Sequence, residues 1–130
     1  MTGYTIVNMR TDVDDQGPNF GLAPDFEARF ARVPLEAELI GITYQRLAPN
    51  YRIPNGHKHK TQEEVYVLVS GSARVKVDDH VREMKPWDAV RVHKDTMRSF
   101  EAGPEGAVFI AVGCPGGPGD AVTTPDWWSD

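Results

Sequence analysis

The chain has 130 residues, with 19 acidic and 14 basic side chains and a formal net charge of −5. This length suits one domain around one core, and the acidic balance argues against nucleic acid or an anionic membrane as a partner, because both attract basic proteins. The single cysteine, Cys114, excludes an internal disulfide and favours a reducing compartment, so we expect a cytoplasmic protein. The longest apolar run, residues 107–112, is too short to span a bilayer.

Short runs with β-strand patterns follow one another along the chain, separated by turns rich in Gly, Pro and Asp. Segment 26–30 alternates as a strand would but also fits one helical face, so its structure stays open here. Asp78 and Asp79 predict a hairpin turn at residues 77–81. Many short strands indicate a β-sandwich or barrel. The predicted strands are 4–9, 39–47, 57–60, 65–69, 72–77, 89–92, 97–101 and 107–113.

The most informative stretch is residues 56–71, which read GHKHKTQEEVYVLVSG. His57 and His59 are separated by one residue, so they share a face if the backbone is extended. Glu64 opens a run in which Glu64, Tyr66 and Leu68 point to one side. If that side is the histidine face, two imidazoles and a carboxylate converge. This ligand set suits Fe, Mn, Ni or Zn.

These residues resemble the first motif of the cupin superfamily, in which H-x-H is followed by a glutamate and then a glycine. His57, His59, Glu64 and Gly71 match it residue by residue, with Gly71 expected to end its strand in a tight turn. The resemblance implies an all-β fold, the cupin double-stranded β-helix or jelly-roll barrel. It divides one domain into an N-terminal extension at 1–38, which packs on or swaps between barrels, a barrel at 39–114 and a C-terminal tail at 115–130.

The tail is rich in Pro and Gly up to Trp127 and Trp128, which we expect to anchor it on the barrel or on a second subunit. A small barrel exposes strand edges, and pairing removes them. We therefore expect a homodimer, formed by packing sheet edges or by exchanging the N-terminal strand.

The second cupin motif is only partly matched. Pro86 and Asp88 fit the family pattern, while Trp87 replaces a glycine and His93 stands where a proline is usual, so His93 is expected at a strand end. The resemblance places the fourth metal-ligating histidine at Arg98. A guanidinium has no lone pair to offer a metal, and inside the barrel it would repel a cation.

Three functions fit this pattern. The first is a metal site formed by His57, His59 and Glu64, with open positions for water or substrate and oxygenase or isomerase chemistry. The second is a metal-free binding or sensing barrel in which Glu64 and Arg98 form a buried ion pair. The third is a metal-free isomerase or epimerase that uses a histidine as its base. We expect a small, anionic organic ligand, and the candidate substrate-binding residues are Arg98, Tyr66 and Phe100.

Overall fold

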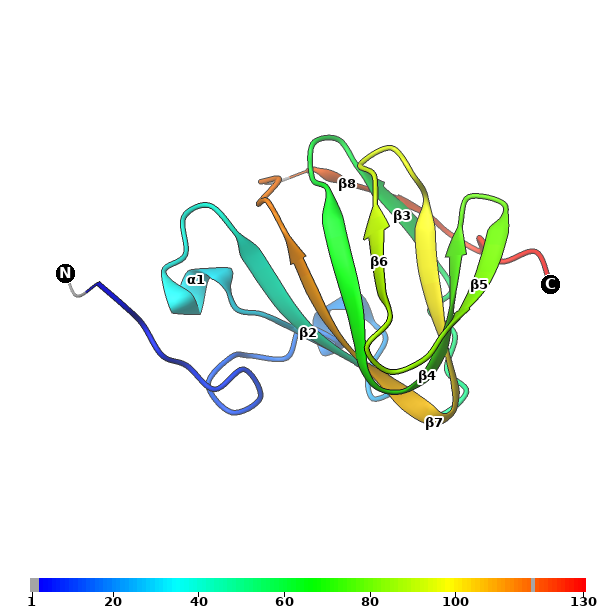
Figure 1. Ribbon diagram of the computed structural model, residues 1–130, viewed down its shortest axis with the longest axis horizontal. Coiled ribbons are helices and arrows are strands. Elements are labelled where there is room, and N and C mark those ends of the chain that lie inside the picture. Colours follow the sequence, from blue (N-terminus) through cyan, green and yellow to red (C-terminus); the bar gives the residue numbers. More distant parts are fainter. Residues whose placement is uncertain (1–2, 118) are drawn as a thin grey trace.

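A computed structural model of the chain describes residues 3–117 and 119–130. Its strands form one curled antiparallel sheet that wraps into a barrel open at one end (Figure 1), which confirms the all-β prediction. No helix in the described ranges is long and apolar enough to cross a membrane. The strands are β1 (Phe26–Phe30), β2 (Gly41–Leu47), β3 (Gly56–His59), β4 (Glu64–Val77), β5 (His80–Met84), β6 (Ala89–Val92), β7 (Arg98–Gly113) and β8 (Ala121–Thr124), with short helical turns at η1 (Pro18–Phe20) and α1 (Arg32–Leu35).

Two long strands, β4 and β7, form the frame of the barrel and pair with each other along almost their whole length. Each was predicted as two separate strands. The register shifts beside Ser70 and Gly71, and such irregularities bend a strand without ending it. Gly71 has a φ of 84°, and a Cβ there would collide with the carbonyl of Gly106 on β7. Gly71 therefore lies within the strand, and the prediction that it ends the strand is wrong.

The N-terminal region differs from the sequence prediction. Residues 4–9 form no strand, and Figure 1 shows this segment reaching away from the barrel. The open question about residues 26–30 is resolved, because β1 pairs antiparallel with β2. Strands β5 and β8 were not predicted, and β8 pairs with β3 although it lies in the tail. The division of the chain into an N-terminal extension, a barrel and a C-terminal tail, with boundaries at residues 38/39 and 114/115, stays a prediction.

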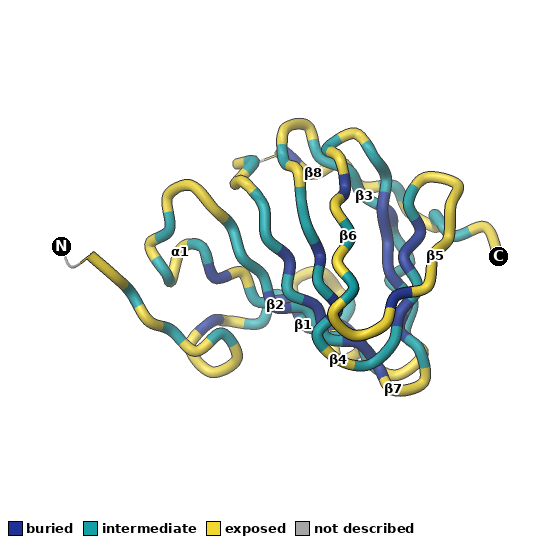
Figure 2. The backbone as a smooth tube through the Cα atoms, viewed as in Figure 1, coloured by how far each residue is buried: buried dark blue, intermediate teal, exposed yellow. Residues whose placement is uncertain are grey.

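The core lies on the concave face of the curled sheet. Registers β1–β2, β2–β7 and β4–β7 place alternate residues of these strands on that face, because side chains alternate along a strand. In Figure 2 the buried positions alternate with more exposed ones along the same strands. The core cluster comprises Phe26, Ala28, Leu47, Tyr66, Leu68, Ala73, Val75, Met84, Val92, Phe100, Ala102, Ala107, Phe109 and Ala111.

The C-terminal tryptophans fasten the tail to the barrel of the same chain. Trp128 Nε1 donates to the carbonyl of Ile53 at 2.8 Å. The Trp127 ring packs so closely over Gly56 that a Cβ at that position would lie 2.5 Å from it. Lys76 Nζ donates to the Trp127 carbonyl at 2.8 Å and lies 4.2 Å from the ring centroid. The predicted anchor on the barrel is confirmed.

Candidate metal centre

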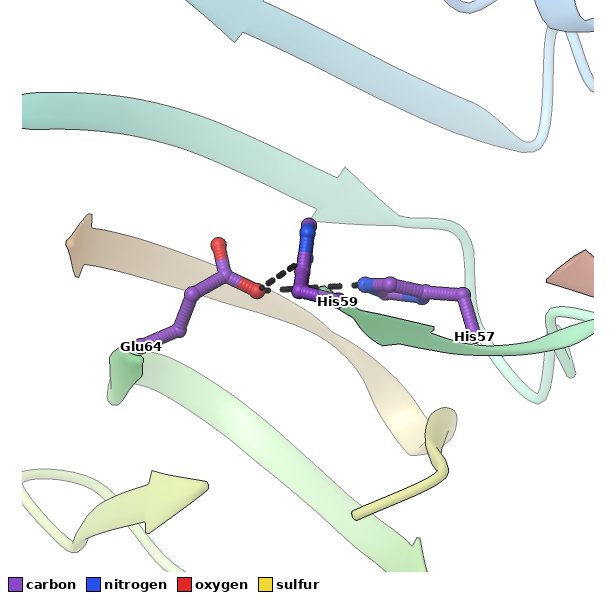
Figure 3. Close-up of side chains that lie close together, drawn as sticks. All are labelled: His57, His59 and Glu64. Atoms are coloured by element: carbon purple, nitrogen blue, oxygen red, sulfur yellow. Dashed lines mark hydrogen bonds and ion pairs between the residues drawn. The ribbon is translucent and has the colours of Figure 1, made fainter. Parts of the chain in front are cut away.

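His57, His59 and Glu64 converge at the open end of the barrel. The two imidazoles project from β3, and the carboxylate comes from the first residue of β4 (Figure 3). Glu64 Oε1 lies 3.0 Å from His59 Nε2 and 3.8 Å from His57 Nε2. Gly113 lies opposite Glu64 on β7, and its missing side chain leaves room for the glutamate. One ligand atom from each residue lies within 4.8 Å of the others.

Asp120, which sequence reasoning missed, contacts the ring nitrogen of His59 that does not face Glu64. Its Oδ2 lies 3.0 Å from His59 Nδ1, while its Oδ1 accepts hydrogen bonds from the backbone N–H and the hydroxyl of Thr61 at 2.9 and 2.7 Å. Asp120 is 94% buried and lies directly before β8. A carboxylate on one imidazole nitrogen orients the ring and leaves the other nitrogen for a metal.

Glu64 is ionised and held in place. Burial alone would raise the pKa of Glu64, but the contacts with His57, His59 and Tyr66 outweigh it and hold the pKa well below its ordinary value. Tyr66 donates its hydroxyl to Oε1 at 2.6 Å, and Gln62 donates to Oε2 at 3.2 Å. Burial and the Glu64 charge raise the pKa of Tyr66, so its hydroxyl keeps the proton that it donates.

The surroundings of His57 favour its neutral form. Burial of the ring lowers the pKa of His57 below its ordinary value; the nearby Glu64 carboxylate opposes this shift, and the positive charge of Arg98 adds to it. A neutral imidazole is the form that binds a metal.

Arg98 lies beside the cluster and is fully buried. It pairs with His57 in the β3–β7 register, at the position where the resemblance expected a fourth ligand. Its guanidinium donates to the carbonyls of His57 and His93 at 3.4 and 3.3 Å, and its Nε has no partner among the residues that the structure describes. Within the described ranges Arg98 forms no ion pair, so the Glu64–Arg98 pair of the metal-free alternative is wrong as a direct contact.

A cavity of about 540 Å³ opens beside the three candidate ligands. His57, His59 and Glu64 line it, as do two of the three predicted substrate-binding residues, Tyr66 and Phe100. The rings of Tyr66 and Phe100 pack against each other with their centroids 4.7 Å apart. Arg98 does not line this cavity.

The residues present fit a divalent transition metal. Donors that bind one ion at about 2.1 Å lie about 3.0 to 4.2 Å apart, and the two contacts of Glu64 with the histidines fall within that spacing. Three protein ligands leave further coordination positions free, which is typical of catalytic rather than structural sites. Because Nδ1 of His59 is engaged by Asp120, a metal at Nε2 would displace any proton shared with Glu64.

Other sequence candidates lie outside the cluster. His93 directly follows β6, as predicted for a strand-end residue, and its ring accepts a hydrogen bond from the backbone of Asp95. Trp87 has a φ of 75°, so it keeps the left-handed backbone of the glycine that it replaces in the motif. Cys114 is exposed.

Comparison with known proteins identifies the fold. No family model and no curated protein matches the chain. Among solved structures, KdgF from Halomonas sp. is 17% identical with a TM-score of 0.69, covering 88% of this chain and 94% of that one. A cupin protein from Bacteroides fragilis is 20% identical with a TM-score of 0.70, and the match covers 100% and 99% of the two chains. Oxalate decarboxylase from Bacillus subtilis is 25% identical with a TM-score of 0.73, and the match covers 91% of this chain but only 32% of the enzyme. The chain therefore has the fold of the cupin superfamily, and it spans about a third of oxalate decarboxylase.

Proposed function

We propose that this cupin-fold protein binds one divalent transition metal through His57, His59 and Glu64, and that a small, anionic organic molecule binds on the metal. The convergence of the three ligand atoms within 4.8 Å, at the edge of a cavity, carries the proposal. Iron, manganese, nickel and zinc all accept this ligand set.

The chain's own residues support such a centre. Asp120 sets the orientation of the His59 ring, and Tyr66 and Gln62 hold the carboxylate of Glu64, so the donors are arranged before a metal arrives. A metal held by these residues would supply Lewis acidity toward an oxygen of the bound molecule and, if it were iron, a position for dioxygen. Oxygenase or isomerase chemistry on the bound molecule is part of the proposal.

In this proposal the metal, rather than Arg98, binds the anionic group. The Arg98 guanidinium donates to the backbone carbonyls of His57 and His93, and Arg98 is not among the described residues that line the cavity. Its role as a substrate-binding residue stays a prediction. In the proposed site, Tyr66 and Phe100 contact the ligand and the metal holds its anionic group.

The test uses oxalate as the probe, because one structural neighbour is named for acting on it. Cobalt(II) is loaded into metal-free protein, and its visible spectrum is followed as oxalate is added. We expect a saturable spectral change in the wild type and in Glu63→Gln, whose side chain is exposed and pairs with Arg91. The change should be lost in Glu64→Gln. Oxalate binding that survives complete removal of the metal would contradict the proposal.

A further inference from the structure

The cavity beside the metal cluster has two chemically different ends. One end carries His57, His59, Gln62 and Glu64. The other is walled mainly by apolar side chains of η1, the loop after it, β1, α1 and β2, and Arg32, Thr43 and Gln45 of these elements also line it. The apolar residues are Phe20, Leu22, Phe26, Phe30, Val33 and Ile42. A cavity of about 540 Å³ is in the range of sites that hold drug-sized molecules, and a two-carbon anion on the metal would leave its apolar end to water.

Charge is scarce along this cavity. Arg32 and Glu64 are the only Asp, Glu, Lys or Arg side chains on its described wall. With a divalent metal at the cluster, positive charge concentrates at the polar end, and only Arg32 provides a cation elsewhere. The described wall therefore favours an anionic group at the metal and a mainly apolar remainder, with Arg32 of α1 as the one cation beside that remainder.

The apolar end also presents aromatic surface to solvent. Phe20 and Phe30 pack edge to face with centroids 6.1 Å apart, yet they remain 53% and 45% exposed. Phe30 lies on the concave face of β1, aligned in register with Thr43 of β2, which also lines the cavity. A ligand reaching from the cluster to these rings would cover them and gain the free energy of removing apolar surface from water.

We infer that the ligand of this site carries an apolar body, aromatic or medium-length aliphatic, attached to a head with two metal-chelating oxygens. The inference rests on the proposed function, since the head binds the metal held by His57, His59 and Glu64. The apolar body occupies the end of the cavity formed by Phe20, Phe30 and their neighbours.

A series of hydroxamates with one fixed chelating head tests this inference. Linear acyl chains from acetyl to octanoyl, together with benzohydroxamate, are titrated calorimetrically into zinc-loaded protein. We expect the affinity to rise about fourfold for each methylene that enters the cavity, and then to level off when the cavity is full. An affinity that is independent of chain length would overturn the inference.

Two serine variants test whether the apolar end of the cavity causes the dependence of affinity on chain length. Phe20→Ser and Phe30→Ser should each flatten the dependence on chain length while leaving the zinc content and the affinity for acetohydroxamate unchanged. Val122→Ser is the matched control, because Val122 is exposed on β8 but does not line the cavity, unlike its neighbours Ala121 and Thr123. An equally steep dependence in both phenylalanine variants would contradict the assignment of the apolar end.

Zinc content separates this inference from the proposed function. Protein that binds no zinc would refute the proposed metal centre, and the apolar inference would fall with it. Protein that binds zinc and acetohydroxamate, without any gain from longer chains, would leave the metal centre standing and refute the apolar body alone. In that case, dimerisation lost in Phe30→Ser would assign the rings to contact with a second copy.

Discussion

Asp120 contacts a candidate metal ligand but is not one itself, so its effect on metal binding can be measured separately. Replacing it with asparagine keeps an acceptor for Thr61 but removes the charge that orients His59. We expect Asp120→Asn to weaken zinc affinity by about 10- to 100-fold. Asp79→Asn, in the exposed hairpin turn, is the control. Unchanged zinc affinity in a folded Asp120→Asn variant would remove Asp120 from the site.

Arg98 gives a gain-of-function prediction. The residue is aligned with His57 in the β3–β7 register and its charge lies close enough to affect the His57 ring. Arg98→His removes a positive charge and adds a donor, so we expect metal affinity to rise by more than tenfold, about 1.4 kcal/mol. Arg91→His, on the exposed side of β6, serves as the control. Equal or weaker nickel and zinc binding would show that residue 98 cannot reach the metal.

The sequence could predict those site residues whose contacts are local in the chain. Alternation along a strand placed His57 and His59 on one face, and the resemblance to the cupin motif added Glu64, which opens the next strand. Asp120 reaches His59 across 61 residues, and nothing in the local pattern marks that contact. The direction of the Arg98 guanidinium depends on the carbonyls of two other segments, which the sequence does not place.

At the scale of elements, β7 and the C-terminal tail share an ion-pair network. Glu101 accepts hydrogen bonds from Arg52 at 2.8 Å and from Arg74 at 2.6 and 2.9 Å, and Arg52 lies 4.3 Å from the Trp128 ring. Burial alone would raise the pKa of Glu101, but these arginines outweigh it and lower the pKa below its ordinary value.

This network predicts a pH-dependent effect of Glu101→Gln. A carboxylate with a lowered folded pKa stabilises the protein above its unfolded pKa of about 4.3, and this stabilisation is lost as the pH falls further. We expect the variant to lose about 1 kcal/mol of unfolding free energy at pH 7 and much less at pH 3. The measurement is urea unfolding at both pH values, with Glu38→Gln as an exposed control. An equal loss at both pH values would mean that charge is not the cause.

The prediction of elements succeeded where a pattern was both regular and local. The strand at 89–92 and the hairpin turn after Val77 were found with their exact bounds or position. Strands β4 and β7 were split in the prediction because glycines usually interrupt strands, whereas here Gly71 and Gly106 allow two bent strands to pass closely. Strand β8 was missed because its pairing partner, β3, is remote in sequence.

For the whole molecule, the homodimer stays a prediction. Exposed apolar side chains lie on the N-terminal segment and beside β2: Ile6 is 84% exposed and Leu39 is 80% exposed. The Thr5 hydroxyl donates a hydrogen bond to the carboxylate of Glu36, and this contact connects the N-terminal segment to the end of α1. Sedimentation should show a dimer for the wild type and a monomer for Leu39→Glu, because a buried unpaired charge is costly in an interface. Val81→Glu on β5 is the control, and a monomeric wild type would contradict the prediction.

The central claim, that His57, His59 and Glu64 hold one metal ion, is tested most directly by metal analysis of His59→Ala. Wild-type protein and the control His80→Ala, altered in the β5 hairpin, should each bind one ion per chain. A ligand that binds only the native state stabilises it by mass action, so the melting temperatures of both proteins should rise with the free metal concentration. At a metal concentration of 100 times the dissociation constant, the free energy of unfolding should increase by about 2.7 kcal/mol. His59→Ala should bind no stoichiometric metal and show no such rise. Equal metal content in wild type and His59→Ala would contradict the assignment of this site.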